Sequence, residues 1–483
     1  MSTASLRLSR RQALGLAVGG AAGAAGLRLA SLHLSGSPSA SVSAAGAAGA
    51  WASPLGTSRG LAAHLLRRAG FGYTDAELDA AASMSYPELV DRMVSQAPQA
   101  PAQPPRMRTD YRAVSSWWYT HMATTTAQFP ERMTLFWHGL LTSDFRKSNR
   151  FPYIYQQNQL YRRLGTGDLR SLLLAATYDP AMMRYLDLDQ STARAPNENF
   201  SRELMELFTL GVGNFSEQDV REGARALSGL RIVLVDAQGQ SLPLPRRQGM
   251  TPQQYYAQLE QLAQSGAAFK GVLTPRLHDG GSKSYLGRTG NIGPEQAVDA
   301  ILAQDACAVH IATKALEHLC SANPSNDLVT RVAGQFRGSG YDIRTLVRAI
   351  LTSDEFTAAA NYRSLVRSPA DYVVATMRAL GQPDLAAQAV TAGAGMGQVL
   401  YDPPTVAGWP SNGAWLSSST LLARVNFAQT VVNRGGSLPD PATAVRNQLD
   451  GVVGPDTAAV LNGSQSTADR WYALLASPEF HLK

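Results

Sequence analysis

Four polar side chains recur at helical spacing within residues 195–230, namely Asn199, Arg202, Glu203 and Glu206. Because residues three and four apart lie on the same face of an α-helix, we expect the four groups to share one face. Two carboxylates beside a guanidinium could act as acid and base with an anion anchor, or Glu203 and Glu206 could ligate a metal. A structural arginine–glutamate network explains the same spacing.

A histidine lies within an apolar helix expected over residues 130–142, in the order Trp137-His138-Gly139. The helix is apolar on all sides, which predicts that it is buried. His138 could present its imidazole to a cavity as a catalytic group, or as a third metal ligand with Glu203 and Glu206. A hydrogen-bonded core histidine is the alternative interpretation.

The glycine-rich stretch 269–293 carries His278, Asp279 and Lys283. Adjacent histidine and aspartate with flexible neighbours suit a catalytic or metal-binding loop. They also suit a surface turn in which the aspartate accepts backbone N–H bonds. A bound divalent metal would be zinc, iron or manganese held by imidazole and carboxylates, because Cys307 and Cys320 lack a ligand spacing.

Two further groups carry weaker patterns. Asp187 and Asp189 alternate in a loop as calcium ligands do, but no further register of oxygen ligands follows them. The loop 401–419, rich in Pro, Gly and Trp, contains Trp409 and Trp415. These tryptophans could form a platform for a sugar or polymer, or they could fix the loop to the core.

Helix signals dominate the chain after residue 57. Asn197 is expected to cap the charged helix, Gly211 to end it, and Ser216 with Asp219 to open the next one. Residues 231–293 interrupt the pattern, either as an excursion with a small β-hairpin or as the lid of a site. The sequence predicts a mainly α protein, with one large helical domain over 53–483 and a two-lobed arrangement as the alternative.

Residues 1–52 are typical of a targeting segment. Ser9-Arg10-Arg11-Gln12-Ala13-Leu14 precedes an apolar run rich in Ala and Gly, which resembles a twin-arginine signal. We therefore expect export by the twin-arginine route to the periplasm, the envelope or the extracellular space. A Ser/Ala/Gly-rich tract follows this run and extends to about residue 53.

Composition excludes several classes of protein. The formal charge of +6 includes four arginines of residues 1–52, a stretch without Asp or Glu, which leaves +2 for the remaining chain. This balance argues against nucleic acid as a partner. Two cysteines do not form a disulfide framework, and beyond the signal no apolar run reaches membrane-spanning length. The sequence also lacks a nucleophile elbow, a Walker loop and a His-Glu-x-x-His motif.

Seven segments together resemble the bacterial family catalogued as domain of unknown function 1800. They are LLRRAGFGYTDAEL, FWHGLLTSDF, PNENFSRELMELFTLGVGNFSEQDVREGARALSGL, HDGGSKSYLG, FRGSGYDIRTLVRAILTSDEF, SPADYVV and YDPPTVAGWP. The resemblance implies a mostly helical, exported protein of no established reaction. It also implies, by association, a phosphatase-like exported partner of the family catalogued as domain of unknown function 1501.

The chain departs from its relatives at histidine positions. Phe208 stands where relatives commonly carry His, and Gly139-Leu140 replaces an Asn-His pair. Two hypotheses follow. In the first, Arg202, Glu203, Glu206 and His138 face His278 and Asp279 in a cleft that catalyses metal-assisted or acid/base hydrolysis of an envelope or extracellular substrate. In the second, the protein is a non-catalytic binding or assembly partner of the phosphatase-like protein.

Overall fold

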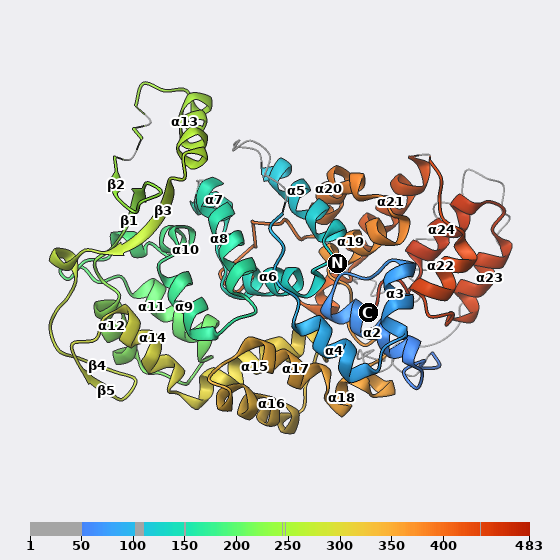
Figure 1. Cartoon of the computed structure of the whole chain (residues 1–483), viewed down its shortest axis with the longest axis horizontal. Coiled ribbons are helices and arrows are strands. Elements are labelled where there is room, and N and C mark those ends of the chain that lie inside the picture. The colour runs from blue at the N-terminus through green and yellow to red at the C-terminus, as the bar shows by residue number, and fades with distance from the viewer. Residues whose placement is uncertain (1–50, 102–110, 149–150, 244, 247, 435) are drawn as a thin grey trace, which may run out of the picture. The chain divides into compact units, whose positions relative to one another are not determined.

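The computed structural model describes residues 51–101, 111–148, 151–243, 245–246, 248–434 and 436–483. The signal predicted over residues 1–52 therefore lies almost wholly outside the described residues. The protein is mainly α-helical, as predicted (Figure 1). No helix among the described residues is long and apolar enough to span a membrane.

The described chain forms two compact units. Unit 1 combines the residues before Val90 with Asp354–Gln398 and Pro410–Lys483, and unit 2 combines Val90–Ser353 with Val399–Trp409. We call the short segment Val399–Trp409 the strap. The division at Leu89 falls inside helix α4 (Tyr86–Val94), which explains why no linker marks it in the sequence.

In unit 1, helix α19 is central, because nearly all of its residues are buried. Ser368 and Asp371 begin this helix with a capping box, and left-handed Gly381 ends it. The helices of unit 1 are α2 (Ser58–Ala69), α3 (Asp75–Ala82), α18 (Asp354–Thr357), α19 (Pro369–Leu380), α20 (Ala386–Gly395), α21 (Ser418–Asn433), α22 (Pro441–Gln448), α23 (Pro455–Gly463) and α24 (Thr467–Ala476), with the 3-10 turns η6 (Ala359–Asn361), η7 (Pro383–Leu385) and η8 (Asn412–Trp415).

In unit 2, helix α6 is buried from Gln128 to His138, as its apolar composition predicted. The other helices are α5 (Tyr111–Thr124), α7 (Phe145–Ser148), α8 (Phe151–Leu164), α9 (Leu169–Thr177), α10 (Pro180–Tyr185), α11 (Glu198–Glu203), α12 (Glu217–Ala226), α13 (Pro252–Gln264), α14 (Pro294–Leu302), α15 (Asp305–Leu319), α16 (Asn326–Gly338) and α17 (Ile343–Leu351); α6 itself is Gln128–Leu140. Short turns are η3 (Leu188–Gln190), η4 (Leu204–Thr209) and η5 (Pro275–Leu277).

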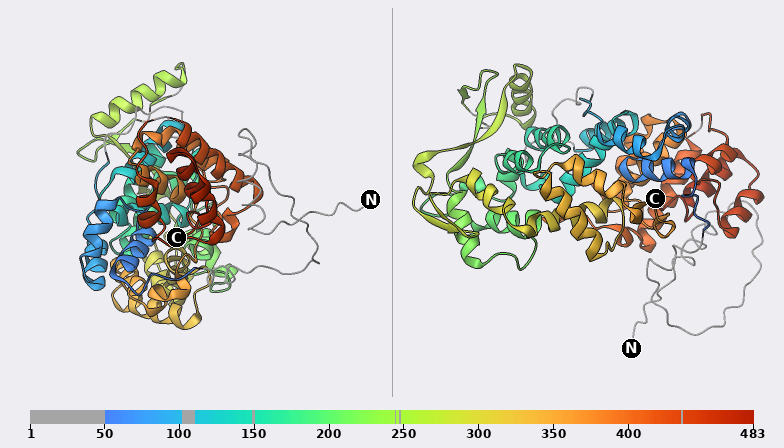
Figure 2. Two further views of the ribbon diagram at one scale, coloured as in Figure 1. Left: turned by 90° about the vertical axis from the view of Figure 1, so that its right-hand side faces the viewer. Right: turned by 60° about the horizontal axis from the view of Figure 1, so that its bottom comes forward.

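The interruption of the helical pattern is a small β region. Strand β1 (Leu230–Val235) pairs antiparallel with β2 (Ser241–Leu242) and with β3 (Ala268–Leu273), so that Val235 faces both Ser241 and Ala268. Helix α13 lies beside this sheet (Figure 2). Strands β4 (Lys283–Tyr285) and β5 (Arg288–Gly290) form the predicted hairpin, whose turn residues Leu286 and Gly287 both have positive φ angles.

The predicted helix signals are present where they matter for the candidate site. Asn197 accepts a hydrogen bond from the Asn199 N–H, Ser216 forms a capping box with Asp219, and Gly211 is left-handed after the charged helix. One local feature differs from the prediction. The charged segment is α-helical only to Glu203, and it continues as the π-helical turn η4.

Candidate functional site

Three carboxylates from distant parts of the sequence act on the phenol of Tyr185 at the end of α10. The pKa of Tyr185 is raised to about 12, first by burial and in addition by the negative charges of Asp144, Glu203 and Asp402. Because the interaction between two charges weakens with distance, all three carboxylates must lie near this ring. We call Asp144, Tyr185, Glu203 and Asp402 the acidic cluster.

Asp144 is placed by the segment that joins α6 to α7. Its Oδ1 accepts a 2.6 Å hydrogen bond from the Lys147 N–H, which satisfies a free donor at the start of α7. The Phe145 N–H donates to the Tyr401 carbonyl of the strap at 2.8 Å. This backbone bond brings Asp144 and Asp402 to the same place.

Glu203 is the last residue of α11, directly before the π-helical turn. Burial raises its pKa, and the neighbouring charge of Glu206 adds to this effect, while Arg202 opposes it. The guanidinium of Arg202 is bound to both oxygens of Glu217, at 2.7 Å each. Among the described residues Glu203 forms no ion pair, so its proton is held more firmly than that of an ordinary glutamate.

Asp402 lies on the strap, and its side chain is only slightly exposed. Burial raises the pKa of Asp402, an effect that Arg146 opposes through a 2.5 Å ion pair and that Asp144 reinforces. The cluster therefore contains two carboxyl groups in different environments. Glu203 is half-buried and forms no ion pair among the described residues, whereas Asp402 is paired with the guanidinium of Arg146. Two carboxyl groups in different electrostatic environments are the arrangement that acid/base catalysis requires.

The structure confirms that Arg202, Glu203 and Glu206 lie near one another, since each affects the electrostatics of its neighbours. It does not join them to the other predicted residues. Among the described residues, no hydrogen bond, ion pair or electrostatic interaction links this group to His138, His278 or Asp279.

The loop of His278 and Asp279 forms the bonds of a surface turn. His278 Nδ1 lies 2.9 Å from the Ser228 carbonyl oxygen, and the Asp279 carboxylate binds Arg225 at 2.7 Å. The Gly281 N–H donates to Asp279, as expected for a turn that an aspartate stabilises. Arg225 lowers the pKa of Asp279, so this carboxylate stays ionised within its ion pair. A catalytic role of the loop stays a prediction.

His138 is buried within an aromatic shell. Its ring lies 5.7 Å from Trp118, 6.4 Å from Tyr161, 5.6 Å from Tyr401 and 5.3 Å from Trp409, measured between ring centroids. Burial lowers the pKa of His138 to about 3, which keeps the imidazole neutral at physiological pH. Neither ring nitrogen has a hydrogen-bond partner among the described residues.

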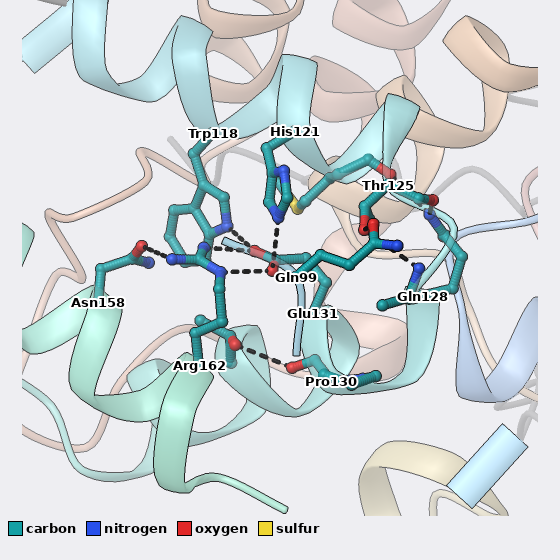
Figure 3. A network of polar contacts seen from close by, with 12 residues as sticks. Gln99, Trp118, His121, Thr125, Gln128, Pro130, Glu131, Asn158 and Arg162 are labelled. Atoms are coloured by element: carbon teal, nitrogen blue, oxygen red, sulfur yellow. Dashed lines mark hydrogen bonds and ion pairs between the residues drawn. The ribbon is translucent and has the colours of Figure 1, made fainter. Parts of the chain in front are cut away.

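A fully paired ionic network close to this shell was not predicted from the sequence (Figure 3). Arg162 of α8 binds both oxygens of Glu131 on α6, at 2.7 Å each, and the Trp118 indole N–H also donates to Glu131. His121 Nε2 lies 3.3 Å from the same carboxylate. Burial alone would raise the pKa of Glu131, but its cationic and donor neighbours hold it at about 2.

The described residues contain no group of three or more His, Cys, Asp or Glu side chains arranged to hold a metal ion. Glu203, Glu206 and His138 therefore do not form such a group, and the His138 ring packs against aromatic side chains. The two thiols, Cys307 and Cys320, are free and buried.

The remaining candidates are engaged in ordinary contacts. Asp187 binds Lys147 at 2.7 Å and Asp189 binds Arg184 at 3.2 Å. Trp415 is buried in unit 1, as expected if it fixes its loop, whereas Trp409 packs against His138 in unit 2. A calcium role of the two aspartates stays a prediction, as does a platform role of the two tryptophans.

The comparisons with known proteins give one family. The model of the family described as protein of unknown function (DUF1800) matches residues 64–482. The chain belongs to this family. No curated protein and no solved structure matches the chain. The DUF1800 match covers both units, and it includes every residue of the acidic cluster and of the aromatic shell.

Sequence reasoning found Glu203 but did not assign Asp144, Tyr185 or Asp402 to its site. A signal for two of them was present, because Asp144 is the penultimate residue of FWHGLLTSDF and Asp402 is the second residue of YDPPTVAGWP. Both segments carry the DUF1800 resemblance, and each places a carboxylate beside an aromatic residue. A local sequence pattern does not show whether two segments that are more than 200 residues apart in the sequence lie close together in the structure.

Proposed function

We propose that the protein is an exported hydrolase in which the acidic cluster supplies acid/base catalysis. The observation that carries the proposal is the convergence of the charges of Asp144, Glu203 and Asp402 on the buried phenol of Tyr185. Half-buried carboxyl groups with raised pKa values are typical of catalytic sites. A π-helical turn, such as the one that follows Glu203, is also frequent at functional sites.

The two environments assign different roles to the two carboxyl groups. Glu203 has no cationic partner of its own and a raised pKa, so it is suited to donate a proton to the leaving group. Arg146 pairs with Asp402 and favours its ionised form, which partly offsets the effect of burial, so Asp402 is suited to take a proton from the attacking water. The bond to the leaving group breaks as the bond to the water oxygen forms, and both carboxyl groups then exchange protons with solvent.

The experiment uses the chain without residues 1–52, purified and incubated with p-nitrophenyl esters, glycosides and phosphates. We expect release of nitrophenol by the unaltered protein, and a loss of about 100-fold or more in kcat/KM for Glu203→Gln and for Asp402→Asn. Glu317→Gln is the matched control, because it removes a carboxylate of α15 that pairs with Lys314 and takes no part in the acidic cluster. Equal rates in all three variants would contradict the proposal, and absence of cleavage would favour a binding or assembly protein.

We also propose that the protein is exported, and this proposal rests only on the residues of the targeting segment. Arg10 and Arg11 precede an apolar, glycine-containing run in the order that a twin-arginine signal requires. Replacing both arginines with lysine should retain the protein in the cytoplasm of a bacterial host with a twin-arginine system, as measured by fractionation. Unchanged export of the double variant would reject this route.

A further inference from the structure

Four buried polar atoms meet in the aromatic shell of unit 2 without any partner. They are both ring nitrogens of His138, the hydroxyl oxygen of Tyr401 and the indole nitrogen of Trp409. None of the three residues forms a side-chain hydrogen bond among the described residues. A buried donor or acceptor without a partner is unfavourable, so four at one place indicate a ligand that satisfies them.

The three side chains face one another closely. The His138 ring contacts those of both Tyr401 and Trp409, with centroid distances of 5.6 and 5.3 Å. His138 is 1% exposed and Tyr401 is 1% exposed. Tyr161 is also in contact with His138, but its hydroxyl already donates to the Leu141 carbonyl at 2.7 Å. The unsatisfied atoms are therefore restricted to one histidine and two residues of the strap.

The electrostatics of the shell select a neutral ligand. Burial is the only cause that lowers the pKa of His138, so no nearby charge acts on this ring. The charges that act on Tyr401 include Arg162 and Glu131, which neutralise each other in a bidentate ion pair. A charged ligand would lose its hydration without gaining a counter-ion, which is unfavourable in a buried site.

The donors and acceptors define the chemistry of the ligand further. Trp409 can only donate, whereas neutral His138 and the Tyr401 hydroxyl each offer a donor and an acceptor. A hydroxyl group, which also donates and accepts, satisfies such a set. The surrounding rings of Trp118 and Trp409 provide apolar walls against which the carbon atoms of a sugar or polyol can pack.

We propose that His138, Tyr401 and Trp409 enclose a binding site for a neutral hydroxyl group, contributed by a carbohydrate or by water. The site is separate from the acidic cluster and contains none of its residues. Two of its three polar residues belong to the strap, so occupation of the site holds the strap against α6.

The first experiment compares the thermal stability of Tyr401→Phe with that of the unaltered chain. If a hydroxyl ligand is bound, removal of the phenol oxygen breaks a hydrogen bond and Tm falls. Tyr161→Phe, which loses a hydrogen bond to a backbone carbonyl, gives the reference decrease. If the site holds nothing, Tyr401→Phe removes an unsatisfied group, and Tm stays unchanged or rises. That result would overturn the proposal.

The second experiment distinguishes the two sources of the hydroxyl. Methyl glucoside and glycerol are added to the unaltered chain, and binding is measured by saturation-transfer difference NMR. A carbohydrate site predicts a signal that disappears in Tyr401→Phe and in Trp409→Phe but persists in Glu317→Gln. A decrease in Tm for Tyr401→Phe without a signal from either probe assigns the hydroxyl to water and rejects the carbohydrate.

Discussion

Glu131 and Glu203 lie in the same unit and experience opposite electrostatic environments. Glu131 is fully buried, and bidentate Arg162 with Trp118 and His121 holds its pKa at about 2 (Figure 3). Glu203 is only half-buried, yet burial and Glu206 raise its pKa, and Arg202, which is bound to Glu217, offsets this only in part. For these two carboxyl groups the partners, more than the depth of burial, decide the direction in which the pKa shifts.

This difference separates structural from chemical roles. A carboxylate whose oxygens are all engaged, as in Glu131, is inert and fixes the relative positions of α5, α6 and α8. A carboxyl group that keeps its proton more firmly and lies beside other carboxylates can exchange that proton with a substrate. The four predictions below test this comparison in order of decreasing effect.

The largest effect is expected from Glu131→Gln. This substitution leaves the buried Arg162 guanidinium without its counter-ion, and removal of one partner of a buried pair costs about 3–5 kcal/mol. The free energy of unfolding, measured by urea denaturation, should fall by this amount. A decrease as small as that of an exposed ion pair would show that Glu131 is not the structural counterpart of Glu203.

The pH dependence of stability should show the same ion pair. The folded-state pKa of Glu131, about 2, lies below its ordinary value of 4.5. Its stabilisation is therefore complete above about pH 4.5 and is lost, by a few kcal/mol, as the pH falls towards 2. The free energy of unfolding, measured between pH 6 and pH 3, should decrease more steeply with falling pH for the unaltered chain than for Glu131→Gln. Parallel profiles of the two proteins would contradict this assignment.

Gly408→Ala should displace the strap that carries Asp402. Gly408 has a φ angle of +87°, and a Cβ atom there would lie 2.1 Å from the Gly139 carbonyl oxygen. The matched control is Gly213→Ala, because Gly213 has a φ angle of +85° and a Cβ atom there would have open space around it. We expect Gly408→Ala to cost more than about 1 kcal/mol beyond the control in thermal unfolding. Equal costs would mean that the strap moves freely.

The smallest effect is expected from Glu203→Gln at neutral pH. Because the folded state raises the pKa of this carboxyl group, its ionised form is disfavoured, and a neutral amide should leave stability unchanged or higher by less than about 1 kcal/mol after solvent screening. Thermal unfolding at pH 7 measures this. A decrease in stability comparable to that of Glu131→Gln would show that Glu203 is structural.

Local features of the fold were predictable because they depend on neighbouring residues. Asn197, Ser216 and Ser368 begin helices where their side chains can cap them, and the apolar stretch around His138 is buried. The π-helical turn after Glu203 was not predicted, because one additional residue in a turn leaves the hydrophobic spacing almost unchanged.

The candidate site was only partly predictable for a related reason. Helical spacing shows that Glu203 and Glu206 share a face, but it cannot show what that face contacts. Asp402 reaches Glu203 and Asp144 only through the strap, and the strap is positioned by contacts such as Gly408 against Gly139. Periodicity within a helix contains no information about contacts of this range.

The order of segments in the two units has a consequence for how the chain acquires its structure during synthesis. The long segment Val90–Ser353 can begin to collapse as soon as it leaves the ribosome, but unit 2 lacks its strap until residues 399–409 follow. Unit 1 begins before Val90 and is closed by Pro410–Lys483, so its early helices must wait for partners that are synthesised after both segments of unit 2. Neither unit can reach its final state on a partly synthesised chain, and the acidic cluster forms only late in synthesis.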